Sequence, residues 1–274
     1  MSRRGLLAGT ILCALIAATA VIVSAAMPTG HTDVQPSGPS SSRARPAPVE
    51  WVVIGRSRQG RRIVAAGFGS GPQRLLVLGG VHGREFGRAV ADRLAVYLAG
   101  HPEAIQPGTR IDVLPCLNPD GAALRRRGNA RNVDLNRNFP TADWTRSLKA
   151  GDPASHGCNG GSAPASEPET QALLHYLRQG FDCVISLHSR GGFLDFNGPH
   201  ARAIASAMSR ACGLPVERIA YQSSITGSLG EYVPAAYRVP VITVELRRPL
   251  LTHGLIDAVV KASTAAGAFA AHHP

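Results

Sequence analysis

Aromatic residues are scarce in this sequence and make up only 5% of its 274 residues. Lysine and arginine outnumber aspartate and glutamate, so the formal net charge is +11. A basic balance can indicate nucleic-acid binding, but no arginine-rich helix or aromatic stacking motif accompanies this charge. We therefore expect no nucleic-acid partner. The positive charge fits anionic envelope polymers and substrates that carry carboxylates, or simply a solvated surface.

Closely spaced cysteines are also lacking, which excludes a zinc or redox site of the Cys-x-x-Cys type. Four of the five cysteines lie beyond residue 26, namely Cys116, Cys158, Cys183 and Cys212. Cys116 and Cys183 fall in segments predicted as buried strands, where a free thiol behaves as a small apolar side chain. We interpret all four as structural, and their disulfide pairing stays open.

The N-terminal segments differ from the rest of the chain. A positive start at residues 2–4, an uncharged run and small residues before residue 27 are typical of an export signal over residues 1–26. The run 5–26 is also long enough for an uncleaved membrane tether. Residues 27–48 are rich in Pro, Ser and Gly and predict a flexible linker. Residues 49–274 would then form one exported, extracytoplasmic domain, secreted or anchored at the envelope, which we expect to be a monomer.

Apolar runs and helical patterns alternate along this domain. Strands are predicted at 74–81, 111–114, 181–187, 217–221 and 239–246, and helices at 85–99, 166–179, 200–212 and 253–271. Ser166 is the expected N-cap of its helix, with Glu169 completing a capping box. The irregular stretch 122–165 is too long for a plain connection and indicates a functional loop. The alternation predicts a single α/β domain with a mixed, largely parallel central sheet and helices on both faces.

Polar residues stand where several predicted strands end. His82 and Glu85 follow the strand at 74–81, and His188 follows the strand at 181–187. Taken singly, each would fit an ordinary turn or a capped strand end. In open α/β sheets, however, ligands bind outside the carboxyl ends of the strands. Two histidines and one carboxylate are a typical ligand set for catalytic zinc, although the same set suits other divalent ions.

Two further features carry possible chemistry. Glu245 lies near the end of an apolar strand, where burial of a carboxylate costs several kcal/mol unless it is paired or useful. It could pair with Arg247 or Arg248, or act as a general base beside a metal ion. Asn136 and Arg137 set an amide next to a guanidinium, which can grip a carboxylate with two parallel hydrogen bonds.

Taken in order, these motifs resemble the zinc metallocarboxypeptidases of the carboxypeptidase A type. The matching motifs are His82-x-x-Glu85, Asn118-Pro-Asp-Gly121, Asp134-Leu-Asn-Arg-Asn-Phe-Pro140, Ser166-Glu-Pro-Glu-Thr170, His188 and Thr243-Val-Glu-Leu246. With a Gly-Ser-Leu-Gly turn at 227–230, the chain is most similar to the branch of murein peptide amidases and γ-D-glutamyl–diaminopimelate peptidases. The resemblance covers roughly residues 50–260 and implies a carboxypeptidase-like fold.

The resemblance also implies which residues perform the chemistry. His82, Glu85 and His188 would hold one Zn²⁺ ion. Asp134 would orient the first histidine, as partners of metal ligands commonly do. Glu245 would be the general base of the reaction.

Substrate binding is implied in the same way. Asn136 and Arg137 would anchor the free carboxylate of the substrate. Arg127 would stabilise the developing oxyanion, although neighbouring arginines could take its place. Tyr221, or Tyr232 as the alternative, would close over bound substrate.

We therefore expect an exported zinc exopeptidase that hydrolyses the terminal amide bond of peptides with a free carboxylate. Cell-wall (murein) peptides, cut at the γ-D-glutamyl–diaminopimelate bond, are the expected substrate. The alternatives are an N-acyl amino acid deacylase of the aspartoacylase type and a catalytically inactive wall-peptide-binding module. In the expected specificity region no acidic residue clearly marks a basic side chain, and Arg190 is a candidate contact for a second carboxylate.

Overall fold

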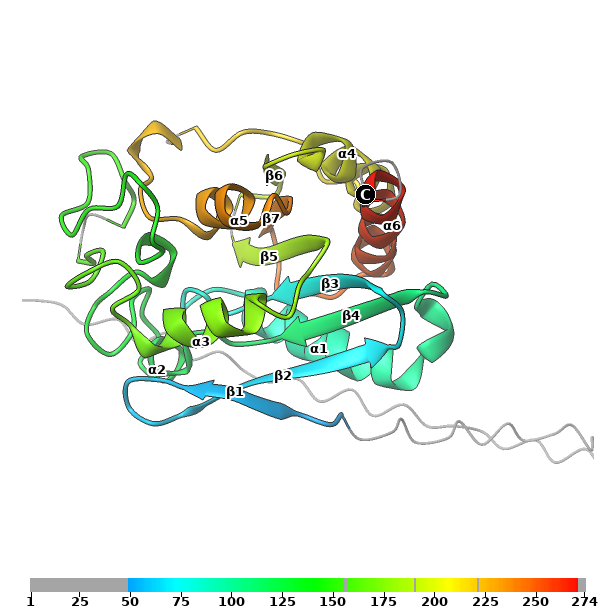
Figure 1. Cartoon of the computed structure of the whole chain (residues 1–274), viewed down its shortest axis with the longest axis horizontal. Coiled ribbons are helices and arrows are strands. Elements are labelled where there is room, and N and C mark those ends of the chain that lie inside the picture. The colour runs from blue at the N-terminus through cyan, green and yellow to red at the C-terminus, as the bar shows by residue number, and fades with distance from the viewer. Residues whose placement is uncertain (1–48, 155–156, 190, 221, 271–274) are drawn as a thin grey trace, which may run out of the picture. The chain divides into compact units, whose positions relative to one another are not determined.

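The computed structural model describes residues 49–270 apart from 155–156, 190 and 221 (Figure 1). These residues form a seven-stranded sheet in the order β1-β2-β4-β3-β5-β7-β6. The strands are β1 Val52–Arg56, β2 Arg62–Gly69, β3 Gln73–Leu78, β4 Thr109–Leu114, β5 Cys183–Ser189, β6 Leu194–Asn197 and β7 Val241–Leu246. β4, β3, β5 and β7 are parallel, while β1, β2 and β6 are joined by antiparallel pairings. The predicted α/β fold with a mixed, largely parallel sheet is confirmed.

Helices cover both faces of this sheet. They are α1 Gly87–Gly100, α2 Pro119–Ala123, α3 Pro168–Leu177, α4 Ala201–Cys212, α5 Leu229–Tyr237 and α6 His253–Ala270, with short 3₁₀ helices at Pro102–Ala104, Leu135–Arg137 and Gln222–Ser224. α1, α4 and α6 pack on one face, and Figure 1 shows α4 and α6 side by side. α3 and α5 pack on the other.

The apolar side chains of β3 point alternately to the two faces of the sheet, which explains why helices must cover both faces. Leu75 and Val77 belong to the core under α1, whereas Leu76 and Leu78 belong to the core under α3. All four are fully buried, and burial of each contributes about 1.5–3 kcal/mol. A continuous apolar run is therefore the expected signature of this central strand.

Two predicted boundaries differ at the carboxyl end of β3. The strand ends at Leu78: the Gly79 N–H still donates to Leu114, the last residue of β4, but the Gly79 and Gly80 carbonyls accept from the segment after β4. α1 begins at Gly87, so Glu85 lies in the turn before the helix and not in its first turn. After β4, the Asn118-Pro-Asp-Gly121 motif forms the start of α2, capped by Asn118, whose side-chain oxygen accepts from the Gly121 N–H at 2.8 Å.

Other local predictions were wrong. Ser166 is not the N-cap of α3: the cap position is Glu167, and the Ser166 hydroxyl donates to the Glu167 carboxylate at 2.9 Å. The predicted strand at 217–221 is absent from the described residues, where Val216 forms only an isolated bridge with Leu194. β1, β2, β6 and α5 were not predicted.

Glycines allow the loops at the carboxyl edge to pack closely. A Cβ on Gly87 would lie 1.9 Å from the Leu187 carbonyl oxygen, and one on Gly83 would lie 1.9 Å from the Gly121 carbonyl carbon. Only glycine fits such approaches of one backbone to another. Close packing here brings the turn that carries Glu85 against the end of β5.

The four cysteines beyond residue 26 are unpaired in the described part of the chain. Cys183 is buried at the start of β5, as predicted. Cys116 is half-buried and lies two residues beyond β4, not within the strand as predicted.

The predicted export signal at 1–26 and linker at 27–48 lie outside the described residues. Among the residues described, no helix combines the length and the apolar character needed to cross a membrane. The tether through residues 5–26 stays a prediction.

Candidate metal centre

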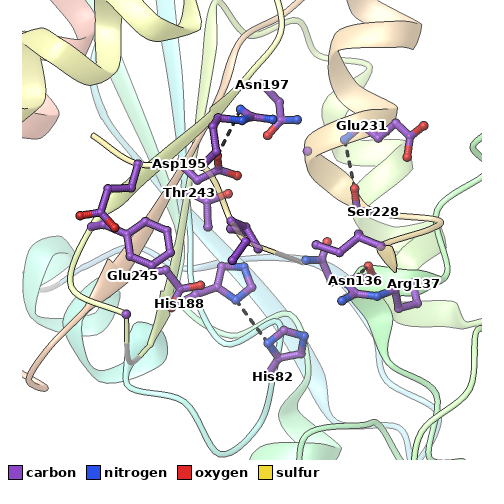
Figure 2. A pocket seen from close by; sticks show the side chains of 18 of the residues that line it. His82, Asn136, Arg137, His188, Asp195, Asn197, Ser228, Glu231, Thr243 and Glu245 are labelled. Carbon is purple, nitrogen blue, oxygen red and sulfur yellow. Dashed lines mark hydrogen bonds and ion pairs between the residues drawn. The ribbon is translucent and has the colours of Figure 1, made fainter. Parts of the chain in front are cut away.

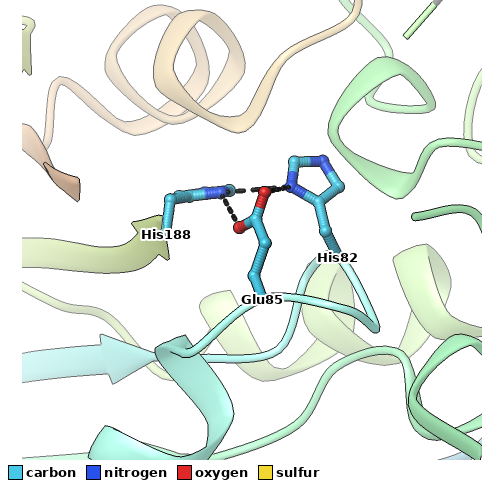
Figure 3. Close-up of side chains that lie close together, drawn as sticks. All are labelled: His82, Glu85 and His188. Carbon is cyan, nitrogen blue, oxygen red and sulfur yellow. Dashed lines mark hydrogen bonds and ion pairs between the residues drawn. The ribbon is translucent and has the colours of Figure 1, made fainter. Parts of the chain in front are cut away.

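His82, Glu85 and His188 meet at the carboxyl edge of the sheet (Figure 3). The His82 Nδ1 lies 2.8 Å from Glu85 Oε1, and the His188 Nδ1 lies 3.0 Å from Glu85 Oε2. The two Nδ1 atoms are 3.3 Å apart. β3 and β5 are parallel neighbours, so the residues at their ends converge as the sequence predicts.

The far sides of both histidine rings are held by buried polar groups. The His82 Nε2–H donates to Asp134 Oδ1 at 3.0 Å, and the His188 Nε2 lies 3.0 Å from the Ser186 hydroxyl. Burial acts to raise the pKa of Asp134, but the charges of Arg127 and His82 outweigh it and hold that pKa well below its usual range. An ionised Asp134 accepts a proton-bearing Nε2 of His82, so Nδ1 is the ring atom that faces Glu85 and is available to a metal ion when it carries no proton.

That arrangement fits a cation better than an empty cluster. A nitrogen lone pair and a carboxylate oxygen 2.8 Å apart repel each other unless a proton or a metal ion lies between them. Two imidazoles and a carboxylate, each with one ligand atom within 4.8 Å of the others, are the donor set of a three-ligand zinc site. The residues present therefore fit one zinc ion.

Arg127 and Asp134 extend this cluster. The Arg127 Nε–H donates to Asp134 Oδ2 at 2.7 Å, and its Nη1 lies 3.7 Å from Glu85 Oε1. Burial acts to lower the pKa of Arg127, but these two carboxylates raise it above its usual value. A permanent positive charge thus stands beside the metal cluster, where the sequence predicts an oxyanion-stabilising group.

Glu245 lies on β7 directly opposite His188 of β5. Burial raises the pKa of its carboxyl group, and the charge of His188 opposes the rise only in part. No ion pair joins it to Arg247 or Arg248 in the described part of the chain. The alternative of a rim ion pair is therefore not realised, and the carboxyl group lines the pocket beside the metal cluster.

Asn136 and Arg137 lie on the 3₁₀ helix at Leu135–Arg137. The Asn136 side-chain oxygen accepts from the Leu229 N–H at 2.9 Å, which orients the amide. The Arg137 guanidinium is 2% exposed and donates to both carboxylate oxygens of Asp152, at 2.5 and 3.0 Å. A third donor binds the Asn136 carbonyl at 2.7 Å, so two of its five N–H groups remain for a ligand.

Asp152 is a residue that the sequence analysis missed. A buried guanidinium needs a counterion, and the stretch 122–165 contains only Asp134, Asp143 and Asp152 as acids. A search of this stretch for the counterion of Arg137 would have given three candidates. The number of residues between Arg137 and each acid does not show which of them is the partner.

These groups open into one pocket of about 610 Å³ (Figure 2). The metal ligands and Glu245 line one side, Asn136 and Arg137 another. Asp195 also lines it, a buried acid where no acidic specificity residue was predicted. Arg190, the predicted contact for a second carboxylate, lies outside the described residues.

The tyrosine predictions have different outcomes. Tyr221 lies outside the described residues, so its role stays a prediction. Tyr232, the alternative, packs against Phe139 and Tyr237 with ring centroids 5.9 and 6.0 Å apart. It is a half-buried residue of α5 that packs against the core on that face of the sheet, and it is not among the described residues that line the pocket.

Comparisons with known proteins point to the same chemistry. Residues 41–234 match the profile of the zinc carboxypeptidases. Murein peptide amidase A of Escherichia coli K12 is 33% identical over 168 residues, which is 57% of this chain and 64% of the relative, just under two thirds of its length. The protein of the same name from Vibrio campbellii is 33% identical over 183 residues, 63% of this chain and 69% of the relative.

Solved structures show the same relation. The murein-tripeptide amidase of Escherichia coli O157 superposes with a TM-score of 0.58 at 27% identity, covering 86% of this chain and 97% of that one. Carboxypeptidase A from Helicoverpa armigera has a TM-score of 0.67 at 19% identity, covering 81% and 69%. The second likeness concerns the fold alone.

Proposed function

The chain belongs to the zinc carboxypeptidase family of hydrolases, whose members use one zinc ion, and we propose that it is a zinc-dependent exopeptidase. It would hydrolyse the terminal amide bond of peptides that end in a free carboxylate. The observation that carries this proposal is the single pocket shared by the His82–Glu85–His188 cluster, the Glu245 carboxyl group and the Arg137 guanidinium.

His82, Glu85 and His188 would hold the zinc ion, which when bound would supply a Lewis acid for the scissile carbonyl and would activate water at neutral pH. Glu245 takes the proton of the attacking water and delivers it to the departing nitrogen. Arg127, kept in place by Asp134, stabilises the negative charge that develops on the carbonyl oxygen. Asn136 and Arg137 hold the carboxylate of the residue being released, so the reacting bond is positioned at the metal.

Murein peptides are the proposed substrate, with the γ-D-glutamyl–diaminopimelate bond as the bond cut. The similarity to murein peptide amidases supports this choice. The predicted export signal at 1–26 supports an extracytoplasmic location, where such peptides occur. A deacylase of the aspartoacylase type and an inactive wall-binding module remain the competing functions.

Incubation of the purified protein with wall tripeptide and simple peptides tests the proposal. We expect release of the C-terminal residue, its loss with a chelator and its return with zinc. Glu245→Gln should bind peptide without cleaving it. Release of acetate or succinate from small amides alone would favour the deacylase. Peptide binding without any chelator-sensitive cleavage by the unaltered protein would favour the inactive module.

A further inference from the structure

Asp195 is a buried acid that the proposed reaction does not use. It lies on the edge strand β6, is 2% exposed and lines the pocket. Its Oδ1 accepts no hydrogen bond in the described part of the protein. The Arg218 Nη1 lies 3.1 Å from that oxygen, an ion-pair distance without the alignment of a hydrogen bond. A buried carboxylate oxygen that lacks a donor is costly unless a ligand supplies one.

Strand register places Asp195 on the same face of the sheet as the catalytic groups. Asp195 of β6 is opposite Thr243 of β7, and Thr243 and Glu245 are two residues apart on one strand. Side chains two residues apart, and those directly opposite on neighbouring strands, share a face. Figure 2 shows Asp195, Thr243 and Asn197 across the pocket from His82.

This wall is where the side chain of the released residue must go. The substrate carboxylate would lie at Asn136 and Arg137, and the reacting bond between Glu245 and the metal cluster. The wall that contains Asp195, Asn197 and Thr243 is then left for the side chain (Figure 2).

Charges of both signs stand close together on that wall. Asp195 supplies a buried negative charge, which suits an ammonium group. Arg218 is 44% exposed on its side chain and lies over the Phe196 ring, 4.7 Å from its centroid, where it also donates to the Phe196 carbonyl. Its positive charge suits a carboxylate near the mouth of the pocket. A lysine side chain would use only the first charge, and an apolar side chain would use neither.

We propose that Asp195 and Arg218 form a subsite for a zwitterionic side-chain terminus, an amino and a carboxylate group on one carbon. The ammonium group would donate to Asp195 Oδ1, and the carboxylate would bind the Arg218 guanidinium. Diaminopimelate carries such a terminus, whereas the common amino acids do not. The subsite rests on the proposed exopeptidase function and assigns the residues that select its substrate.

If Asp195 and Arg218 only stabilise the fold, a different result is expected. Asp195 and Arg218 also connect β6 to the segment around Val216, through the Leu194–Val216 bridge and the ion pair. If that were their only role, substitutions would lower the turnover of every substrate alike. Selective loss on some substrates is therefore the diagnostic result.

The experiment compares three peptides, L-alanyl-γ-D-glutamyl-X with X as meso-diaminopimelate, L-lysine or L-alanine. For the unaltered protein, we expect kcat/KM to decrease from the first peptide to the third. Asp195→Asn should lower kcat/KM at least about thirtyfold for the first two peptides, since it removes a buried counterion. Arg218→Gln should lower it about fivefold for diaminopimelate only, since its contact is half-exposed. Glu103→Gln, an exposed acid that is not among the described residues lining the pocket, is the control and should leave all three values unchanged.

Binding supplies a readout without turnover. Isothermal titration of zinc-loaded Glu245→Gln with the three peptides should give the same order of affinity, and adding Asp195→Asn should remove the preference. Cleavage or binding that does not distinguish the three peptides, or equal losses for all three in Asp195→Asn, would overturn the subsite and leave the exopeptidase intact. Selective binding with no cleavage of any peptide by the unaltered protein would overturn the exopeptidase and leave the subsite intact.

Discussion

Replacing Asp152 by asparagine should leave the guanidinium of Arg137 buried without a counterion. The pair is 2% and 0% exposed on its side chains, and two hydrogen bonds of 2.5 and 3.0 Å join it. Loss of one partner from such a pair costs about 3–5 kcal/mol, because the remaining charge stays desolvated. We expect Asp152→Asn to lower the free energy of unfolding by that amount. For a domain of this size the melting temperature should fall by roughly 6–20 °C.

Urea unfolding followed by circular dichroism measures the loss, and a double variant separates charge from shape. Arg137→Met with Asp152→Leu removes both charges at similar volume and should recover part of the stability; the Ala154 N–H, which donates to Asp152 Oδ1 at 2.8 Å, then loses its acceptor. The same double variant should raise KM for peptides strongly, because the group that anchors the substrate carboxylate is gone. Recovered stability with lost binding would assign the pair to substrate recognition.

A matched control comes from the same stretch of chain. Asp143 is half-buried and accepts from the Thr141 hydroxyl at 2.6 Å, with no arginine in that contact. Asp143→Asn should cost less than about 1 kcal/mol. A loss below about 1 kcal/mol for Asp152→Asn as well would refute the reasoning, because the pair would then behave as an exposed one.

Two further predictions concern buried titratable groups. Burial raises the pKa of Glu169 above 4.5, although the Arg58 N–H and the Asn129 amide donate to it. The folded protein therefore binds this proton more tightly than the unfolded chain, and the destabilising effect of the ionised carboxylate shrinks as pH falls toward its folded pKa. Urea titrations of the unaltered protein and of Glu169→Gln measure this effect. The difference in the free energy of unfolding, unaltered protein minus variant, should increase as the pH is lowered from about 7 to about 5. A decrease would contradict the assignment. Burial also raises the pKa of Cys183 to about 12 and that of Cys116 to about 11, so both should react slowly with a disulfide reagent in the folded protein. All four thiols beyond residue 26 should react in urea without reductant, and a smaller number would show a disulfide.

The metal ligands could be predicted because apolar runs identify the buried parallel strands. The sequence predicted strands at 74–81 and 181–187 with His82 and His188 at their ends, and the structure shows that β3 and β5 are parallel neighbours, so the two histidines meet at one edge of the sheet. Glu245 follows from the same logic on β7. In these strands the apolar pattern of the sequence and the pairing of the strands in the sheet agree. The order of the motifs along the chain therefore indicated which residues meet.

The pocket wall that contains Asp195, Asn197 and Thr243 could not be predicted in this way. β6 has only four residues, Leu194 to Asn197, and mixes apolar and polar side chains without the run of a buried strand. Its place beside β7 depends on antiparallel pairing, and only that register sets Asp195 opposite Thr243. α5 was missed because Pro234 lies inside it, a residue that normally argues against a helix. In both cases tertiary contacts outweigh local preference.

The positions of the three candidate metal ligands along the chain also bear on how the protein folds. His82 and Glu85 are neighbours in the chain, whereas His188 lies 106 residues from His82. In an unfolded chain only the first two could reach one ion, and closing so long a loop costs entropy before any third ligand bonds. The ion therefore cannot act as a nucleus for folding. It would bind late, after β3 and β5 have paired. Its binding would therefore slow unfolding more than it speeds folding.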